Sequence, residues 1–222
     1  MWVGFFAVVY LGLAAFSDPG VMTFVLIVLA LAFLAAGGLY WYASRRGRFE
    51  VWAQLLDATP APRRMLDLGC GRGAVSIMAA TRFADVRVDG VDLWRSIDQS
   101  GNSPDASAAN AAANGVADRI TFTTGDMTAL PFDAASFELV TASLSIHNIK
   151  SADGRAKAID EAWRVLAPGG RMIILDISRT AEYAARLTEP GARDLIKRPA
   201  GWRVWWSGPW MASTIVTASK PG

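Results

Sequence analysis

The sequence predicts an α/β fold with a mostly parallel sheet, preceded by an N-terminal transmembrane helical hairpin. From residue 64 onward, apolar segments typical of strands alternate with segments of helix-forming composition, the pattern of a sheet covered by helices on both faces. The first 44 residues differ, because their only charged residue is Asp18. We therefore expect three parts: a hairpin at residues 1–43, a basic and amphipathic connector at 44–62, and an α/β domain at 63–222.

Length and charge limit the class of protein. With 222 residues and a formal net charge of +2, the chain is long enough for one α/β domain and an additional segment, and its charge balance requires no nucleic-acid partner. The single cysteine, Cys70, cannot form a disulfide within the chain, which agrees with a reducing compartment. We expect no bound metal.

The hairpin is predicted from two apolar segments and a turn. Residues 21–43 are apolar over a length that can cross a bilayer as a helix, whereas residues 2–16 are uncharged but short. Residues 17–20 contain Asp, Pro and Gly, which stop helices. The short first arm leaves a re-entrant, tilted or monotopic segment as alternatives. A cleaved signal peptide is disfavoured, because its positively charged n-region is missing.

Basic residues predict the orientation. Arg45, Arg46 and Arg48 follow the second apolar segment directly, and the turn near Asp18 has no basic residue. The positive-inside rule therefore places the domain in the cytosol. The connector that follows carries apolar residues on one side of a helix around residues 49–56. Two interpretations stay open and are compatible: a helix lying on the membrane surface, and a helix packed on the edge of the sheet.

The domain begins with a strand, a glycine turn and a helix. Residues 65–68 are apolar apart from Asp67 and are followed by Gly69, Gly71 and Gly73, after which residues 74–80 have helix-forming composition. Glycine lets a backbone approach a ligand closely, and the N-terminus of a helix directs free N–H groups at an anion. The turn therefore predicts a ligand with a carboxylate or a phosphate.

The second strand, at residues 86–92, ends on Asp92. A carboxylate about twenty residues after a glycine turn lies where the diol of a ribose can bind, although this does not identify the cofactor. In the long loop that follows, Trp94 is a candidate to lie against an adenine or to cover the pocket, with ordinary packing as the alternative. The next helix is marked by Ser103 as its cap, by Pro104, and by Asn114 at its end.

The remaining elements continue the alternation. Strands are predicted at residues 120–124, 137–143 and 171–177, and a helix at 154–166 that ends in an Ala-Pro-Gly-Gly turn. The tail at residues 201–220 suits an antiparallel hairpin. Its four tryptophans within nine residues are predicted to be strand residues that bury a large area, or residues at a bilayer interface.

The segment Asp67-Leu68-Gly69-Cys70-Gly71-Arg72-Gly73 resembles the first motif of the class I S-adenosylmethionine (SAM) dependent methyltransferases. In the dinucleotide motif G-x-G-x-x-G the third glycine comes three positions after the second, but here Gly73 follows Gly71 by two. The Pro-Gly-Gly turn at residues 168–170 also matches the methyltransferase family, and the resemblance covers residues 64–177. It implies a Rossmann-like methyltransferase fold, a mostly parallel seven-stranded sheet with an antiparallel last strand.

The resemblance also implies a cofactor site for SAM and its product S-adenosylhomocysteine. The methionine end would lie over the glycine turn, and the methyl group would point toward the end of the fourth strand. The residues assigned to the cofactor are Asp67, Gly69, Gly71, Gly73, Asp92, Trp94, Asp126, Met127 and Ser143. Asp67 would lie near the ammonium group, Asp92 at the ribose, and Asp126 with Met127 at the adenine. An Asx turn with a buried methionine is the structural alternative for this last pair.

The only histidine, His147, follows the fourth strand and is a candidate general base for a hydroxyl or ammonium nucleophile. A loop residue that only shapes the pocket is the alternative. We therefore expect a membrane-anchored methyltransferase that acts on a small, lipophilic or membrane-resident acceptor. The competing hypotheses are an NAD(P)-dependent oxidoreductase and a non-catalytic, membrane-tethered cofactor-binding protein.

Overall fold

The computed structural model describes residues 19–95 and 101–222. The predicted first arm of the hairpin, residues 2–16, lies outside the described residues, as do residues 96–100 of the loop after Trp94. Pro19, predicted within the turn, is helical instead.

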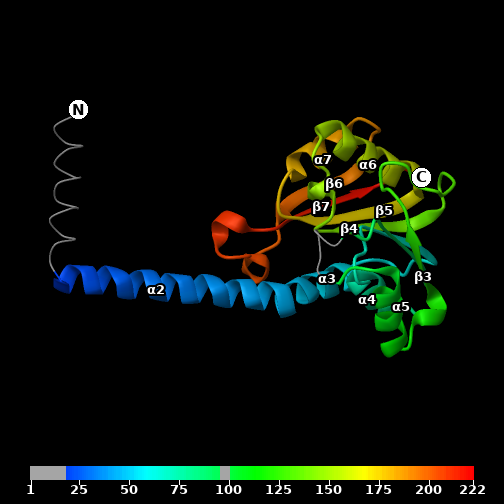
Figure 1. Ribbon diagram of the computed structural model, residues 1–222. Coiled ribbons are helices and arrows are strands. Elements are labelled where there is room, and N and C mark those ends of the chain that lie inside the picture. Colours follow the sequence, from blue (N-terminus) through cyan, green and yellow to red (C-terminus); the bar gives the residue numbers. More distant parts are fainter. Residues whose placement is uncertain (1–18, 96–100) are drawn as a thin grey trace.

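One long helix leads into the domain. It consists of α2 (Pro19–Tyr42), a π-helical segment η1 (Ala43–Gly47) and α3 (Arg48–Asp57), and Figure 1 shows α2 projecting away from the rest of the molecule. No residue of α2 is buried, and its 24 residues extend over about 36 Å, against about 30 Å for the apolar core of a bilayer. Within residues 19–95 and 101–222, this is the one helix long and apolar enough to cross a membrane.

Helix α3 belongs to the core of the domain. Val51, Trp52, Leu55 and Leu56 are buried and pack with side chains of the sheet and of α4 (Ala74–Arg82). Of the two interpretations of the connector, packing against the domain is therefore the one that the structure shows for this apolar face.

The sheet has seven strands in the order β3-β2-β1-β4-β5-β7-β6. The last strand runs antiparallel to both of its neighbours, and strands β1 to β5 pair in parallel, as predicted. The bounds are β1 (Arg64–Leu68), β2 (Arg87–Asp92), β3 (Ile120–Thr124), β4 (Phe137–Ser143), β5 (Leu166–Asp176), β6 (Arg193–Pro199) and β7 (Thr214–Ser219).

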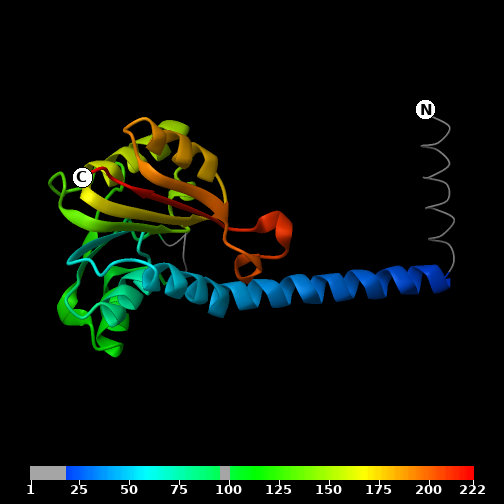
Figure 2. The same cartoon turned by 180° about the vertical axis from the view of Figure 1, so that it is seen from behind.

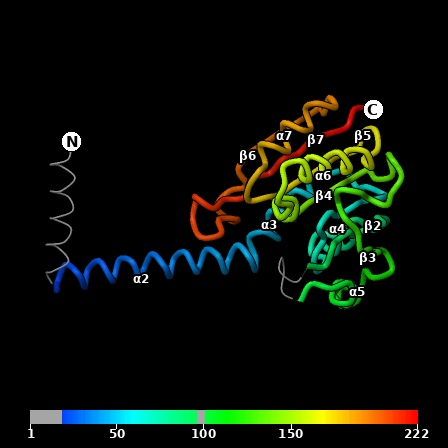
Figure 3. The backbone as a smooth tube through the Cα atoms, turned by 45° about the horizontal axis from the view of Figure 1, so that its top comes forward, coloured from blue at the N-terminus to red at the C-terminus, as the bar shows by residue number. Residues whose placement is uncertain are grey.

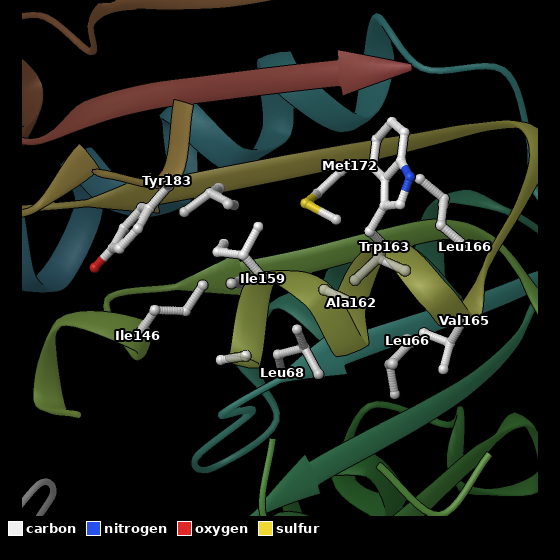
Figure 4. Packing of buried hydrophobic residues seen from close by; sticks show 14 of the residues in the cluster. Leu66, Leu68, Ile146, Ile159, Ala162, Trp163, Val165, Leu166, Met172 and Tyr183 are labelled. Atoms are coloured by element: carbon white, nitrogen blue, oxygen red, sulfur yellow. The ribbon is translucent and has the colours of Figure 1, made fainter. Parts of the chain in front are cut away.

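Helices cover both faces of this sheet (Figure 1). Helices α3, α4 and α5 (Pro104–Ala113) lie on one side, and α6 (Ala152–Val165) and α7 (Thr180–Thr188) on the other. Figure 4 shows the core under α6 and α7, where Trp163, Met172 and Tyr183 pack together with aliphatic side chains of β1. Short 3-10 turns occur at η2 (Ala117–Arg119), η3 (Ile146–Asn148), η4 (Trp202–Val204) and η5 (Pro209–Met211).

Two sequence predictions are corrected in the last third of the chain. The Pro-Gly-Gly turn at residues 168–170 lies within β5, which is longer than predicted, and the register of its pairing with β4 shifts near Phe137. The tryptophan-rich segment is not a strand. Residues 201–211, which we call the tryptophan loop, connect β6 to β7, and Figures 2 and 3 show this loop beside the base of the long helix.

Aromatic and polar contacts fix the tryptophan loop to the helix. The rings of Tyr42 and Trp202 stack at 5.2 Å between centroids. Glu50 accepts hydrogen bonds from the Tyr42 hydroxyl and from Nε of Arg203, both at 2.9 Å. Gly47 lies so close to the loop that a Cβ atom there would be 1.8 Å from the carbonyl oxygen of Arg203. A glycine is therefore needed where the loop crosses the helix.

Candidate active site

A cavity of about 760 Å³ opens where the carboxyl ends of the parallel strands meet the long helix, a volume typical of ligand pockets. The predicted site residues that line it are Asp67, Gly69, Gly71, Asp92, Asp126, Met127 and Ser143. The structure thus brings together residues that are far apart in the sequence, because the parallel strands β1, β2, β3 and β4 all end at the same edge.

The glycine turn forms the floor of the cavity. Gly69 and Gly71 have φ angles of +62° and +52°, which favour glycine, and both line the cavity. A Cβ atom on Gly69 would be 2.3 Å from Cβ of Ser145, so any side chain here would displace the segment after β4. Gly73 has a different role: it precedes α4 with φ +78° and packs against the ring of Phe122 rather than lining the cavity.

Asp67 is buried beneath the turn and holds it in place. Its carboxylate accepts hydrogen bonds from the backbone N–H (3.1 Å) and hydroxyl (2.7 Å) of Ser76 and from the hydroxyl of Thr141 (2.9 Å). Burial raises the pKa of Asp67 to about 6, despite these hydrogen bonds. A cationic group in the adjacent cavity would favour the charged form of this side chain.

Asp92 holds the loops on both sides of the cavity. One carboxylate oxygen accepts the backbone N–H of Gly71 at 2.8 Å, and the other accepts the N–H of Trp94 at 2.6 Å and the amide of Asn102 at 3.2 Å. The amide oxygen of Asn102 is buried and has no hydrogen-bond partner among the described residues. One buried polar atom without a partner among the described residues therefore lies beside the predicted ribose position.

Trp94 is not among the residues that line the cavity, and its contacts are those of ordinary packing, the alternative to a place over the ligand. Its indole N–H donates to the hydroxyl of Thr124 at 2.8 Å, and its ring meets Phe122 edge-on at 6.5 Å. The backbone of Trp94 has φ +55°, which turns the side chain toward the outer strand β3. Composition could not predict this local conformation.

Asp126 and Met127 follow β3 and line the cavity. One oxygen of Asp126 accepts both the backbone N–H and the hydroxyl of Thr128 at 2.8 Å, so the Asx-type turn is present. The turn uses one carboxylate oxygen and leaves the other for a ligand. The structural and the functional interpretations of Asp126 are therefore compatible.

Ser143 ends β4 and joins the cavity to the long helix. Its hydroxyl accepts the indole N–H of Trp52 at 2.8 Å, across 91 positions of sequence. The next residue, Leu144, lines the cavity with φ +55°, an uncommon conformation for a bulky side chain. Such strained residues cluster at functional sites.

His147 is not among the residues that line the cavity, and its role as a general base stays a prediction. Its ring forms a pair with the fully buried carboxylate of Asp176 at the end of β5. That carboxylate also accepts the His147 backbone N–H at 3.2 Å and the hydroxyl of Tyr183 at 3.3 Å. The contacts of this histidine are those of a residue that fixes the segment after β4.

The long helix and the tryptophan loop form one wall of the cavity. The sequence predicts that the connector at residues 49–56 and the tryptophans near Trp205 lie at the mouth of the pocket, but it assigns neither Ser44 nor Arg48 to the site. The lining residues of this wall are Tyr40, Ser44, Arg48, Phe49, Trp52 and Trp206. Four of them are spaced by four residues, which places them on one face of a helix. This spacing could have indicated a common face of the helix. It could not have indicated what that face contacts, because Trp52 and Ser143 at the end of β4 are 91 positions apart in the sequence.

Comparisons with known proteins agree with this geometry. Residues 65–170 match the family model of a methyltransferase domain. The chain is 32% identical over 136 residues to the ubiquinone/menaquinone biosynthesis C-methyltransferase UbiE of Roseobacter denitrificans; these residues are 60% of this chain and 51% of that protein. The chain thus spans about half the length of the curated relatives that it matches.

Solved structures share the fold. The geranyl diphosphate C-methyltransferase of Streptomyces coelicolor, solved with S-adenosylhomocysteine, has a TM-score of 0.60 and 16% identity, covering 78% of this chain and 78% of that chain. The [4+2]-cyclase SpnF has a TM-score of 0.62 and 19% identity, covering 76% and 81%. The match of residues 65–170, the strand order and the glycine turn together identify this part of the chain as a domain of the SAM-dependent methyltransferase type.

Proposed function

We propose that this protein transfers the methyl group of SAM to a small, lipophilic acceptor that reaches the site from a membrane. The observation that carries the proposal is the composition of the cavity wall. One side is the glycine turn of the methyltransferase domain, and the other is the base of an apolar helix long enough to span a bilayer.

The cavity residues fit the cofactor. SAM supplies an activated methyl group and its own leaving group, so the protein mainly aligns the reactants and excludes water. We assign Asp67 to the ammonium group, the backbone at Gly69 and Gly71 to the methionine portion, and Asp92 to the ribose. Asp126 and Met127 are assigned to the adenine.

The acceptor is proposed to react without a strong general base from the protein. Within the described residues, the acids that line the cavity are Asp67, Asp92 and Asp126, and each already accepts backbone or hydroxyl hydrogen bonds. His147 is paired with Asp176. Burial raises the pKa of the Cys70 thiol, so it stays neutral. A carbon of an electron-rich, quinone-like ring fits this chemistry, and UbiE is named as a C-methyltransferase.

The membrane arrangement is part of the proposal. We propose that residues 1–43 form a hairpin of two spans, that residues 44–62 connect it to the domain at 63–222, and that Arg45 and Arg46 lie on the cytosolic side. Trp41 and Trp210 are 59% and 78% exposed at the base of the helix and in the tryptophan loop. Both suit a bilayer interface, which tryptophan favours.

Labelled cofactor tests the proposal. Full-length protein in membranes of the source organism is incubated with methyl-labelled SAM, and the labelled product is identified by mass. We expect label in a small molecule that extracts with the lipids, and less label at limiting SAM with Asp92→Ala, which should lose about 1–3 kcal/mol of cofactor binding. Cofactor binding without any labelled product from membranes or extracts would contradict the proposed activity.

A further inference from the structure

Arg48 differs from the other basic residues near the membrane helix. The sequence groups it with Arg45 and Arg46 as a topology signal, but those two are exposed, whereas Arg48 is half-buried and lines the cavity. Its Nε atom is buried and has no hydrogen-bond partner among the described residues. Burial lowers the pKa of this guanidinium, because its surroundings disfavour the charge.

Arg48 also lacks a counter-ion. Within residues 19–95 and 101–222, none of the ion pairs includes it; its guanidinium instead lies 4.7 Å from the ring centroid of Phe49. The other arginines that line the cavity, Arg72 and Arg95, are exposed and remain solvated. A partly buried cation without a partner is costly unless a ligand supplies the opposite charge.

Arg48 lies on the face of the long helix that lines the cavity. Tyr40, Ser44, Arg48 and Trp52 line the cavity at intervals of four residues, and the π-helical segment at residues 43–47 lies within this stripe. Such π-helical turns are frequent at functional sites. Trp52 binds Ser143 at the end of β4, and Tyr40 contacts Trp206 at 6.1 Å between ring centroids. Arg48 therefore lies between the inner end of the cavity and its membrane side.

We propose that Arg48 is the oxyanion-binding residue of this cavity and pairs with a carboxylate or phenolate of a bound molecule. This inference rests on the proposed function, which offers two sources of the oxyanion. One is the methionine carboxylate of SAM, and the other is an acidic group on the acceptor. A planar guanidinium with several donors suits either one.

Calorimetry on the full-length protein in discs of neutral phosphatidylcholine tests this assignment. The variants are Arg48→Met and Arg48→Lys, and Arg46→Met is the control because it is exposed on the same helix. The cofactor arm compares S-adenosylhomocysteine with its decarboxylated analogue, which lacks only the carboxylate. The acceptor arm adds 4-butylbenzoate or 4-butylbenzamide to protein loaded with S-adenosylhomocysteine.

We expect Arg48→Met to lower the affinity for one of the two carboxylate ligands by about tenfold or more. The affinity for the matched ligand without the carboxylate should not change. If only the affinity for S-adenosylhomocysteine falls, Arg48 binds the carboxylate of the cofactor. If only the affinity for 4-butylbenzoate falls, Arg48 binds the acidic group of the acceptor. Arg48→Lys should recover part of the loss, and Arg46→Met should show none. If Arg48→Met changes neither carboxylate ligand, the assignment is wrong. If wild-type protein does not bind S-adenosylhomocysteine at all, the proposed function fails instead.

Discussion

The buried carboxyl group of Asp67 should make cofactor binding depend on pH. Its pKa is about 6 in the free protein, and an ammonium group bound beside it would lower that pKa. Binding therefore favours the deprotonated form, so the affinity for SAM should rise by up to about tenfold per pH unit below pH 6 and level off above it. Calorimetry from pH 5 to 8 measures this dependence. Asp67→Asn should flatten the curve, whereas Asp89→Asn, in the neighbouring strand and paired with Arg64, should keep it.

The glycine turn gives a second prediction for a single residue. Gly69→Ala places a methyl group against Ser145 at a position with φ +62°, so the affinity for SAM should fall by about tenfold or more. Gly115→Ala is the matched control, because its φ is +69° but the space around it is open. Both variants should lose about 1–2 kcal/mol of stability from backbone strain, and only Gly69→Ala should lose binding. Equal affinities in the two variants would remove the turn from the site.

Sequence reasoning at this scale predicted residues that line the cavity where a local motif fixes the backbone. Asp67, Gly69, Asp92 and Asp126 line it because each lies at or just after the carboxyl end of a parallel strand. The conformations of side chains in irregular segments were not predictable in this way. The side chain of Trp94 contacts Thr124, and that of His147 contacts Asp176. These contacts depend on the loop conformation and on partners distant in sequence, neither of which can be inferred from residue spacing.

At the scale of elements, the close contact between the tryptophan loop and the long helix at Gly47 should stabilise both the loop and the helix. Alanine normally favours a helix over glycine by up to about 1 kcal/mol. Gly47→Ala should nevertheless destabilise the protein, because the new Cβ would meet the carbonyl of Arg203. Hydrogen exchange should show lost protection of the Trp206 amide, which donates to the carbonyl of Met211. Gly37→Ala, with open space on the same helix, should keep that protection; loss in both variants would contradict this account.

The order of strands and helices was largely predictable, because alternating apolar segments and helix caps are local signals. The cap at Ser103 is one example, since its side chain accepts the N–H of Ala106 at 3.1 Å as expected. Strand β6 and helix α7 were not predicted. The sequence Arg193–Pro199 is polar and lies at the exposed edge of the sheet, so it lacks the apolar alternation that marks a buried strand.

For the whole molecule, the long helix joins a membrane-length segment to the wall of the active site. The sequence predicted an apolar span and an amphipathic connector as separate parts, but not that they form one continuous helix. The packing of Trp52 against Ser143 depends on the complete fold. Because α3 is buried in the domain, the proposed membrane span is joined to the cavity by a continuous helix rather than by a flexible linker. Holding enzyme and acceptor at one surface raises their effective concentration.

The most direct measurement compares full-length protein in lipid discs with a variant that lacks residues 1–38 and so keeps Tyr40 in the cavity wall. Each is assayed on the membrane-embedded acceptor identified with labelled SAM and on a soluble, short-chain analogue of that acceptor. We predict that the deletion lowers kcat/KM for the embedded acceptor by about a hundredfold or more, as expected for lost tethering, and changes that for the analogue little. Affinity for SAM should be unchanged. If the truncated and full-length proteins use the two acceptors in the same ratio, the membrane does not supply the substrate and the central claim is wrong.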